Sequence, residues 1–226
     1  RDHSHYKGHT MLDIDDLVTK LIKGHPVSVR FKYTNDKILQ EFHVLFIHIL
    51  AYFDQLFLLE VSFTILKEIL YNASKANAKR LFFIREGLDI SNPEDYQKGM
   101  EIFADEVTMK WSEQQEYLDK SDFYIQFDAR IEKNILYIQA ENNAPVLPEE
   151  QERIFKRIEA AQKYNDLSDA FMDMSDSTES AGLGLILTQI LLKNSGIGRD
   201  KFKIGKYRFK KAIFAFVLNS SFSYPT

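Results

Sequence analysis

Residues 59–79 read LEVSFTILKEILYNASKANAK and are the most informative stretch of the sequence. Large apolar side chains recur here every three or four residues, which is the spacing of one face of an α-helix. That face consists of Leu59, Phe63, Leu66, Leu70 and Ala73. Val61 and Ile65 add a second apolar line on another side of the same helix. The pattern predicts a largely buried helix over about 55–79.

Three polar residues of this helix continue the second apolar line. Glu68, Asn72 and Lys75 are spaced i, i+4 and i+7, so they lie within about 60° of arc. The solvent-facing stripe is assigned instead to Glu60, Lys67 and Ser74. Burying a charge without a partner is costly. The pattern therefore indicates either a satisfied structural network or an enclosed polar ligand or metal.

The same three side chains suit phosphoryl transfer if a ligand is enclosed. An amide oxygen such as that of Asn72 is a hard ligand suited to Mg²⁺. The carboxylate of Glu68 can orient or deprotonate an attacking hydroxyl or water, and the ammonium of Lys75 can neutralise phosphate oxygens.

A glycine motif, Gly182-Leu183-Gly184-Leu185, begins a predicted helix after a polar loop. Free backbone N–H groups and the helix dipole favour an anion at such a position. Glycine there also serves tight turns and close helix packing, so the motif alone leaves both interpretations open.

The rest of the sequence alternates helical and strand-like segments. Further helices are predicted over 11–23, 35–53, 92–118, 148–162 and 182–194. Strands are predicted over 27–33, 80–84, 123–127, 134–140, 201–204 and 212–218. The strands 123–127 and 134–140 would form an antiparallel hairpin, 141–145 a turn, and 163–181 a polar loop. This order predicts an α+β fold with one sheet and one helical layer.

Composition narrows the class of function. The chain has 226 residues, a formal net charge of −4 and no cysteine. A dedicated nucleic-acid-binding protein would normally carry a basic excess, and thiolate metal sites and cysteine nucleophiles are excluded. No run of 18 apolar residues occurs, so we expect no membrane contact by this segment. These features favour a cytoplasmic domain, either alone or as the cytosolic part of a longer protein.

Four motifs follow one another along the chain. They are Glu68-x-x-x-Asn72-Ala73-x-Lys75, the segment IQAENNAP at 138–145, Arg153-Ile154-Phe155 and Gly182-Leu183-Gly184-Leu185. In order and spacing they resemble the N, G1, F and G2 boxes of the ATPase family shared by histidine kinases, gyrase-type topoisomerases, heat-shock chaperones and mismatch-repair proteins. The resemblance covers about residues 27–220, with 1–26 as a leader and helix and 221–226 as a tail.

The resemblance implies a fold and a cofactor site. The fold would be a two-layer α/β sandwich of the Bergerat type, with a mixed sheet packed on helices and a helical insertion over about 85–120. The cofactors would be ATP and Mg²⁺. Asn72 would hold Mg²⁺, Glu68 would be the base or orient water, and Lys75 would approach phosphate. The backbone of Gly182, Leu183, Gly184 and Leu185 would bind phosphates, beneath a lid formed by 156–181.

The G1 box differs from the usual family pattern. Glu141 stands where the family has an aspartate that accepts a hydrogen bond from the adenine amino group. Asn143 and Pro145 stand where the family has glycines, and this Asn-Asn-x-Pro form resembles the variant G1 box of some sensor kinases. The resemblance therefore implies that Glu141 and Asn143 contact the nucleotide.

Two hypotheses about function follow. The first is the ATP-binding catalytic domain of a histidine-kinase-like protein, which transfers phosphate to a protein acceptor in signal transduction. His43 and His48 lack the acidic neighbour of a phospho-accepting histidine, so the acceptor would lie on another segment or on a partner. The second is a nucleotide-sensing or nucleotide-independent module that regulates a partner protein. Either hypothesis allows a homodimer, and the 85–120 insertion is either a partner surface or part of the core.

Overall fold

The computed structural model of the chain describes residues 12–164, 166, 168–170, 183–196, 202–204 and 209–217. Within these residues a five-stranded sheet has the order β1-β2-β3-β5-β4. Its strands are β1 (Val27–Phe31), β2 (Ile125–Glu132), β3 (Ile135–Pro145), β4 (Phe202–Ile204) and β5 (Phe209–Val217). All neighbouring strands are antiparallel. The prediction of a mixed sheet is therefore wrong for the described strands, because β3 and β4, which run in the same direction, are separated by the antiparallel strand β5.

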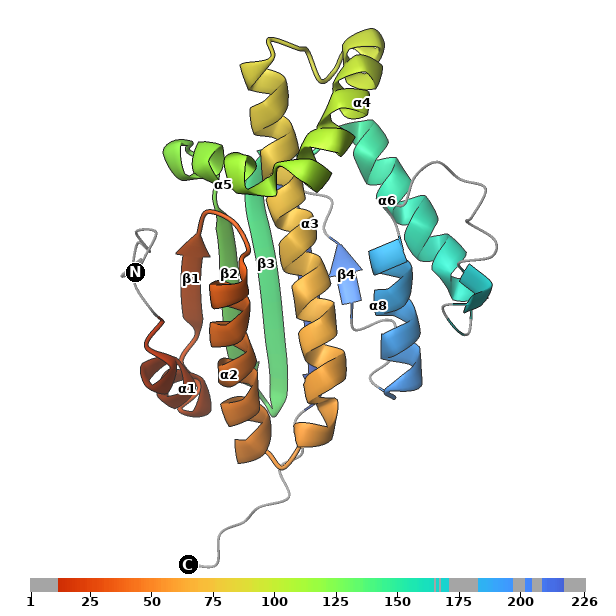
Figure 1. Cartoon of the computed structure of the whole chain (residues 1–226). Coiled ribbons are helices and arrows are strands. Elements are labelled where there is room, and N and C mark those ends of the chain that lie inside the picture. The colour runs from red at the N-terminus through yellow and green to blue at the C-terminus, as the bar shows by residue number, and fades with distance from the viewer. Residues whose placement is uncertain are drawn as a thin grey trace, which may run out of the picture.

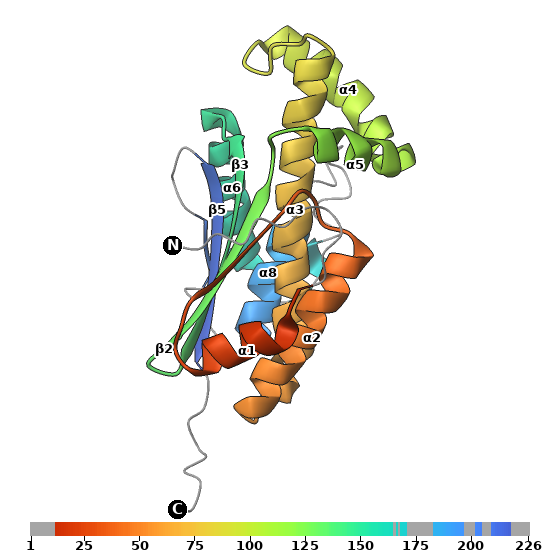
Figure 2. The ribbon, with the colours of Figure 1, turned by 90° about the vertical axis from the view of Figure 1, so that its left-hand side faces the viewer.

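The helices lie mainly on one side of this sheet. They are α1 (Ile14–Ile22), α2 (Asp36–Tyr52), α3 (Leu59–Arg85), α4 (Pro93–Met109), α5 (Trp111–Lys120), α6 (Pro148–Ala160) and α8 (Leu183–Asn194), with 3-10 turns η1 (Leu56–Leu58) and η2 (Ala161–Lys163). Figure 1 shows α3 crossing in front of the sheet between α2 and α8. Figure 2 shows the sheet edge-on beside these helices. The predicted α+β class is confirmed.

The main core lies between β1, β2 and β3 and the inner faces of α2 and α3. Alternate residues of each strand are buried, as expected for a sheet covered on one face. Phe42 of α2 packs against Phe127 of β2 with ring centroids 4.4 Å apart. Ile65 and Leu66, one from each apolar line predicted for α3, are fully buried. Each such side chain contributes about 1.5–3 kcal/mol on burial, so this layer contact stabilises the fold.

The prediction that Ser74 faces solvent is wrong. Ser74 is fully buried where α3 passes the segment after β1. The Thr34 N–H donates to Ser74 Oγ at 2.8 Å, and Ser74 Oγ lies 2.9 Å from Thr34 Oγ1. A small hydroxyl can be buried when its hydrogen bonds are made, so position on the helix alone did not decide exposure.

The predicted strand over 80–84 is also wrong, because α3 continues to Arg85. Phe82 and Phe83 have high strand propensity, but both are buried in a second cluster with residues of α4 and α5. Gly87, with φ +65°, ends the helix, and the Leu88 N–H donates to the Phe83 carbonyl at 3.0 Å. This is a common glycine termination of a helix, so Gly87 was the signal for its true end.

The predicted insertion over about 85–120 consists of α4 and α5, which pack around the far end of α3 (Figure 1). The single helix predicted over 92–118 is interrupted at Lys110, whose φ of −132° is not helical. This break turns α5 so that Leu118 reaches the same cluster as Phe103 of α4. The interpretation of the insertion as core agrees with these contacts.

The predicted hairpin of β2 and β3 is confirmed. Its two-residue turn consists of Lys133 and Asn134, both with positive φ (+50° and +59°), which matches the twist of the paired strands. The predicted turn at 141–145 is wrong, since β3 runs on to Pro145. The pairing of β3 with β5 shifts register between Asn142 and Pro145. A cavity opens at this irregularity, and both residues line it.

None of the helices described combines the length and apolarity needed to cross a bilayer.

Candidate functional site

A cavity of about 710 Å³ lies between α3, α4, α6, the start of α8 and the end of β3. Its volume falls within the range of small-molecule sites. Four of the predicted site residues line it, namely Asn72 and Lys75 of α3 and Gly184 and Leu185 of α8. Segments far apart in the sequence therefore meet at one place.

Glu68 is not among the described residues that line the cavity, but it touches the start of α8. A Cβ atom built on Gly184 would overlap Oε2 of Glu68 and lie 3.0 Å from its Cδ. The absence of a side chain at Gly184 is what lets the carboxylate lie against the first turn of α8. The predicted base and one predicted phosphate-binding glycine are therefore in direct contact.

The two predicted residues of the G1 box are not brought to the cavity. Glu141 occupies a half-exposed position on β3, between the buried Ala140 and Asn142, so it points to the face of the sheet opposite the helices. Asn143 points the same way and binds the chain before β2. It accepts a hydrogen bond from the Tyr124 N–H at 2.8 Å and donates to the Asp122 carbonyl at 2.9 Å.

Asn142, rather than Glu141 or Asn143, lines the cavity. Its Nδ2 donates to Oδ1 of Asn77 at 3.1 Å, and Asn77 Nδ2 donates to the Tyr124 carbonyl at 3.0 Å. Among the described side chains, Asn142 Oδ1 is one of the buried atoms without a hydrogen-bond partner. Sequence reasoning missed Asn142 and Asn77, although the alternation of buried Ile138 and Ala140 would have placed Asn142 on the inner face.

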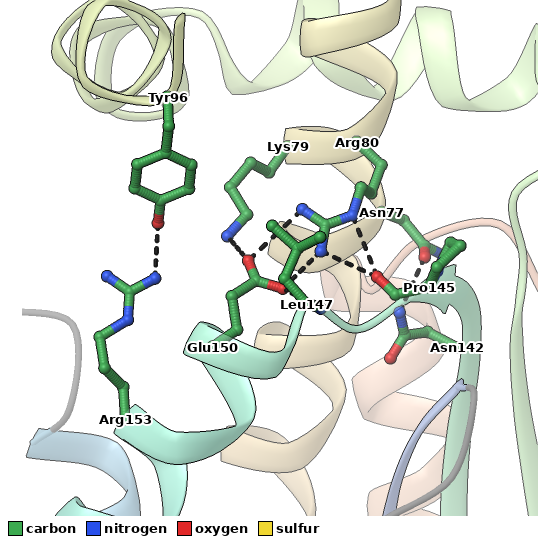
Figure 3. A network of polar contacts seen from close by, with 9 residues as sticks. All are labelled: Asn77, Lys79, Arg80, Tyr96, Asn142, Pro145, Leu147, Glu150 and Arg153. Carbon is green, nitrogen blue, oxygen red and sulfur yellow. Dashed lines mark hydrogen bonds and ion pairs between the residues drawn. The ribbon is translucent and has the colours of Figure 1, made fainter. Parts of the chain in front are cut away.

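Glu150 joins the end of β3 and the start of α6 to α3 (Figure 3). It forms ion pairs with Lys79 and Arg80, and its Oε2 accepts from the Leu147 N–H at 3.2 Å. Arg80 also donates to the Pro145 carbonyl through Nε at 3.0 Å and Nη2 at 2.8 Å. Burial raises the pKa of Glu150, but Lys79 and Arg80 lower it more, to about 2. The carboxylate therefore stays ionised at neutral pH.

Positive charge predominates among the ionisable residues described at the cavity wall. The basic residues are Lys75, Lys79, Arg80, Arg153 and Arg157, and the acidic ones are Glu101 and Glu150. The five cations outnumber the two carboxylates, so this wall carries a net positive charge that is suited to an anionic ligand.

Across the cavity, a hydrogen bond joins α4 and α6. Arg153 Nη2 donates to the Tyr96 hydroxyl at 2.7 Å (Figure 3). The Tyr96 ring also packs at 6.0 Å from the ring of Phe83, measured between centroids. The insertion thus contributes a wall of the cavity as well as core.

Some predicted features cannot be located. Gly182 and half of the predicted lid (165, 167 and 171–181) lie outside the described residues, and Leu183 is described only as the first residue of α8. Within the described part of the chain, no three His, Cys, Asp or Glu side chains gather closely enough to hold a metal ion.

Comparison with known proteins gives no family assignment. No family model matches the chain, and no solved structure matches it. The chain is 32% identical over 139 residues to a protein of Treponema pallidum (strain Nichols) described as uncharacterized. The matched segment covers 62% of this chain and 27% of that protein, so the chain spans about a quarter of its relative's length.

Proposed function

We propose that this chain contains an ATP-binding domain of the histidine-kinase-like type, with a Bergerat-type sandwich, that transfers phosphate to a protein acceptor in signal transduction. The observation that carries the proposal is the convergence of Asn72 and Lys75, Asn142, and Gly184 and Leu185 on one cavity. These residues come from three of the four motifs. Structural packing alone does not require such polar residues to share a cavity.

The β3 side of the cavity suits an adenine base. Asn142 lines the cavity, and its amide group is of a kind that can bond the edge of an adenine base. Met100, Phe103, Ala144 and Ile154 supply apolar lining. A flat aromatic base could therefore pack against this lining.

The α8 side suits phosphates. The first N–H groups of a helix have no intrahelical partner and favour an anion, and Lys75 adds a positive charge. The amide of Asn72 fits a site for Mg²⁺, which commonly takes one or two protein ligands and completes its shell with phosphate oxygens and water. When bound, Mg²⁺ would neutralise charge on the transferred phosphate. Glu68, beside Gly184, would accept the proton of the attacking hydroxyl.

Calorimetric titration with Mg-ATP tests the proposal. We expect the intact chain to bind Mg-ATP, and Asn72→Ala to weaken binding about tenfold or more and to remove its dependence on Mg²⁺. Lys67→Ala, on the same helix but outside the described cavity lining, is the matched control and should bind like the unaltered chain. Absence of binding at millimolar nucleotide would overturn the proposal.

Gly184→Ala tests the contact between Glu68 and α8. The added methyl group overlaps the end of a flexible side chain, so Glu68 can turn away, and alanine favours the helix. We expect the free energy of unfolding to change by less than about 1 kcal/mol while ATP turnover falls. Thermal unfolding and a phosphate-release assay measure the two effects. Full turnover in this variant would show that the position of Glu68 does not matter.

The alternative, a nucleotide-sensing module without catalysis, is favoured by one observation. Glu68 lies against Gly184 and outside the described cavity lining. In an enzyme, its carboxylate would have to reach the oxygen that attacks the phosphate. The substitution Glu68→Gln separates the two functions.

A further inference from the structure

The outer face of α2, which is turned away from the sheet, carries little charge. Charged residues make up 27% of the chain, yet residues 42–53 include no Asp, Glu, Lys or Arg. Val44, His48 and Tyr52 are spaced i, i+4 and i+8, so they form one line along the helix, and all three are exposed. Figure 2 shows α2 on the side of the helical layer away from the sheet. A helix face exposed to water normally carries charged side chains.

The 3-10 turn η1 extends this surface beyond the end of α2. Leu56 and Phe57 of η1 are 50% and 73% exposed, and η1 packs against α2. With Val44 and Tyr52 they are four of the seven large apolar side chains exposed in the described part of the chain. Single exposed apolar residues are common, but a group gathered on one surface marks an interaction site. We call the surface of Val44, His48, Tyr52, Leu56 and Phe57 the α2 face.

The two ends of the α2 face carry opposite charge. At the N-terminal end of α2, the exposed Lys37 lies within about 20° of the azimuth of His48, and Asp36 is about 100° away from Lys37. Beyond the C-terminal end, Asp54 and Glu60 are exposed. An antiparallel copy of α2 brings Lys37 of each copy to the acidic end of the other, whereas a parallel copy brings like charges together. A second copy of this chain is therefore complementary to the face.

Other occupants fit the α2 face less well. An anionic membrane surface favours a basic face, but here Asp54 and Glu60 outnumber Lys37. A basic amphipathic helix from another protein would set like charges beside Lys37. The antiparallel second copy satisfies both ends of the face and covers its uncharged middle.

We propose that the α2 face is a dimer interface, on which a second copy of this chain binds through its own α2 face in antiparallel orientation. Such a contact has a two-fold axis, and residues on the axis meet their own counterparts. His48 is the midpoint of the line, so the two His48 side chains lie together, with Val44 of each copy near Tyr52 of the other. No residue of the α2 face is among the described residues that line the cavity, so both cavities stay accessible. The inference goes beyond the proposed function and does not depend on it.

Analytical ultracentrifugation of the full chain without nucleotide, over about 1–100 µM, tests the inference. We expect the unaltered chain to form dimers in this range. His48→Asp and His48→Lys each place two like charges at the axis, and each should raise the dimer dissociation constant about tenfold or more. An equimolar mixture of the two variants sets a carboxylate against an ammonium group and should restore dimers. Ser112→Asp and Ser112→Lys, which introduce the same charges at an exposed position of α5, should dimerise like the unaltered chain.

Three results would each overturn the inference. They are an unaltered chain that stays monomeric up to about 100 µM, His48 variants that dimerise as well as the unaltered chain, and a mixture that stays monomeric. His48 is exposed, so both variants should fold, which circular dichroism checks. Should either fail to fold, Lys37→Glu replaces them, because it sets like charges together at both ends of the contact, and unchanged dimerisation would then contradict the inference.

The result is separate from the proposed function. Because no nucleotide is present in the measurement, absence of ATP binding leaves the dimer interface standing. A monomeric chain, in turn, overturns the interface and leaves the proposed nucleotide binding standing.

Discussion

Glu68→Gln is expected to lower ATP turnover about a hundredfold or more while Mg-ATP affinity stays nearly unchanged. The amide keeps the size of the side chain and its place beside Gly184, but it cannot take up a proton. Removal of a general base slows the chemical step without removing ground-state binding. Phosphate release at saturating nucleotide, together with calorimetric affinity, gives the two quantities.

The matched control is Glu60→Gln, the same chemical change at an exposed position of α3. It should leave turnover and affinity as they are. Undiminished turnover in Glu68→Gln would contradict the assignment of Glu68 as base. Nucleotide binding without turnover in the unaltered chain would favour the sensing module if turnover is also absent when the segment or partner that carries the acceptor is added.

Glu150→Gln is expected to lower the free energy of unfolding by roughly 3 kcal/mol at neutral pH. The change leaves Lys79 and Arg80 without their buried counter-charge. It also weakens the contact that holds the Pro145 end of β3 against α3. Urea denaturation of both proteins measures the difference.

The destabilisation caused by Glu150→Gln should become smaller as the pH falls. The folded-state pKa of Glu150 is about 2 and its ordinary value is 4.5, so the carboxylate stabilises the fold above pH 4.5. This stabilisation is lost as pH falls from 4.5 toward 2, and the difference between the two proteins should shrink over that interval. Glu152→Gln, which removes an exposed carboxylate paired with Lys156 on the same helix, is the control and should change little. A pH-independent difference would rule out this ion pair as the cause.

The sequence predicted the helices and strands whose apolar residues follow a regular period. The apolar lines of α3 and the alternation of β2 and β3 are periodic, and these elements lie where they were expected. The prediction failed where tertiary packing determines local structure, as at Phe82 and Phe83, whose strand-like side chains are buried by α4 and α5. No local pattern contains that information.

Part of the candidate site was predicted because some of its residues belong to short sequence motifs. Asn72, Lys75, Gly184 and Leu185 were found because their motifs are local, and they meet at one cavity. The resemblance aligns Glu141 with the family aspartate, whereas Asn142 is the residue that lines the cavity. Strand alternation outweighs this chemical likeness, since a shift of one residue turns a side chain to the other face of the sheet. The ion pairs of Glu150 link segments distant in sequence and left no local signal.

The length of α3 has a consequence for ligand entry. Its 27 residues extend about 40 Å, and it belongs to both the main core and the cluster beneath α4 and α5. A continuous helix embedded at both ends resists bending, so the cavity beside its middle cannot widen on that side. Any opening or closing around a ligand must therefore come from movement of the shorter helices α4, α6 and α8 against a fixed wall.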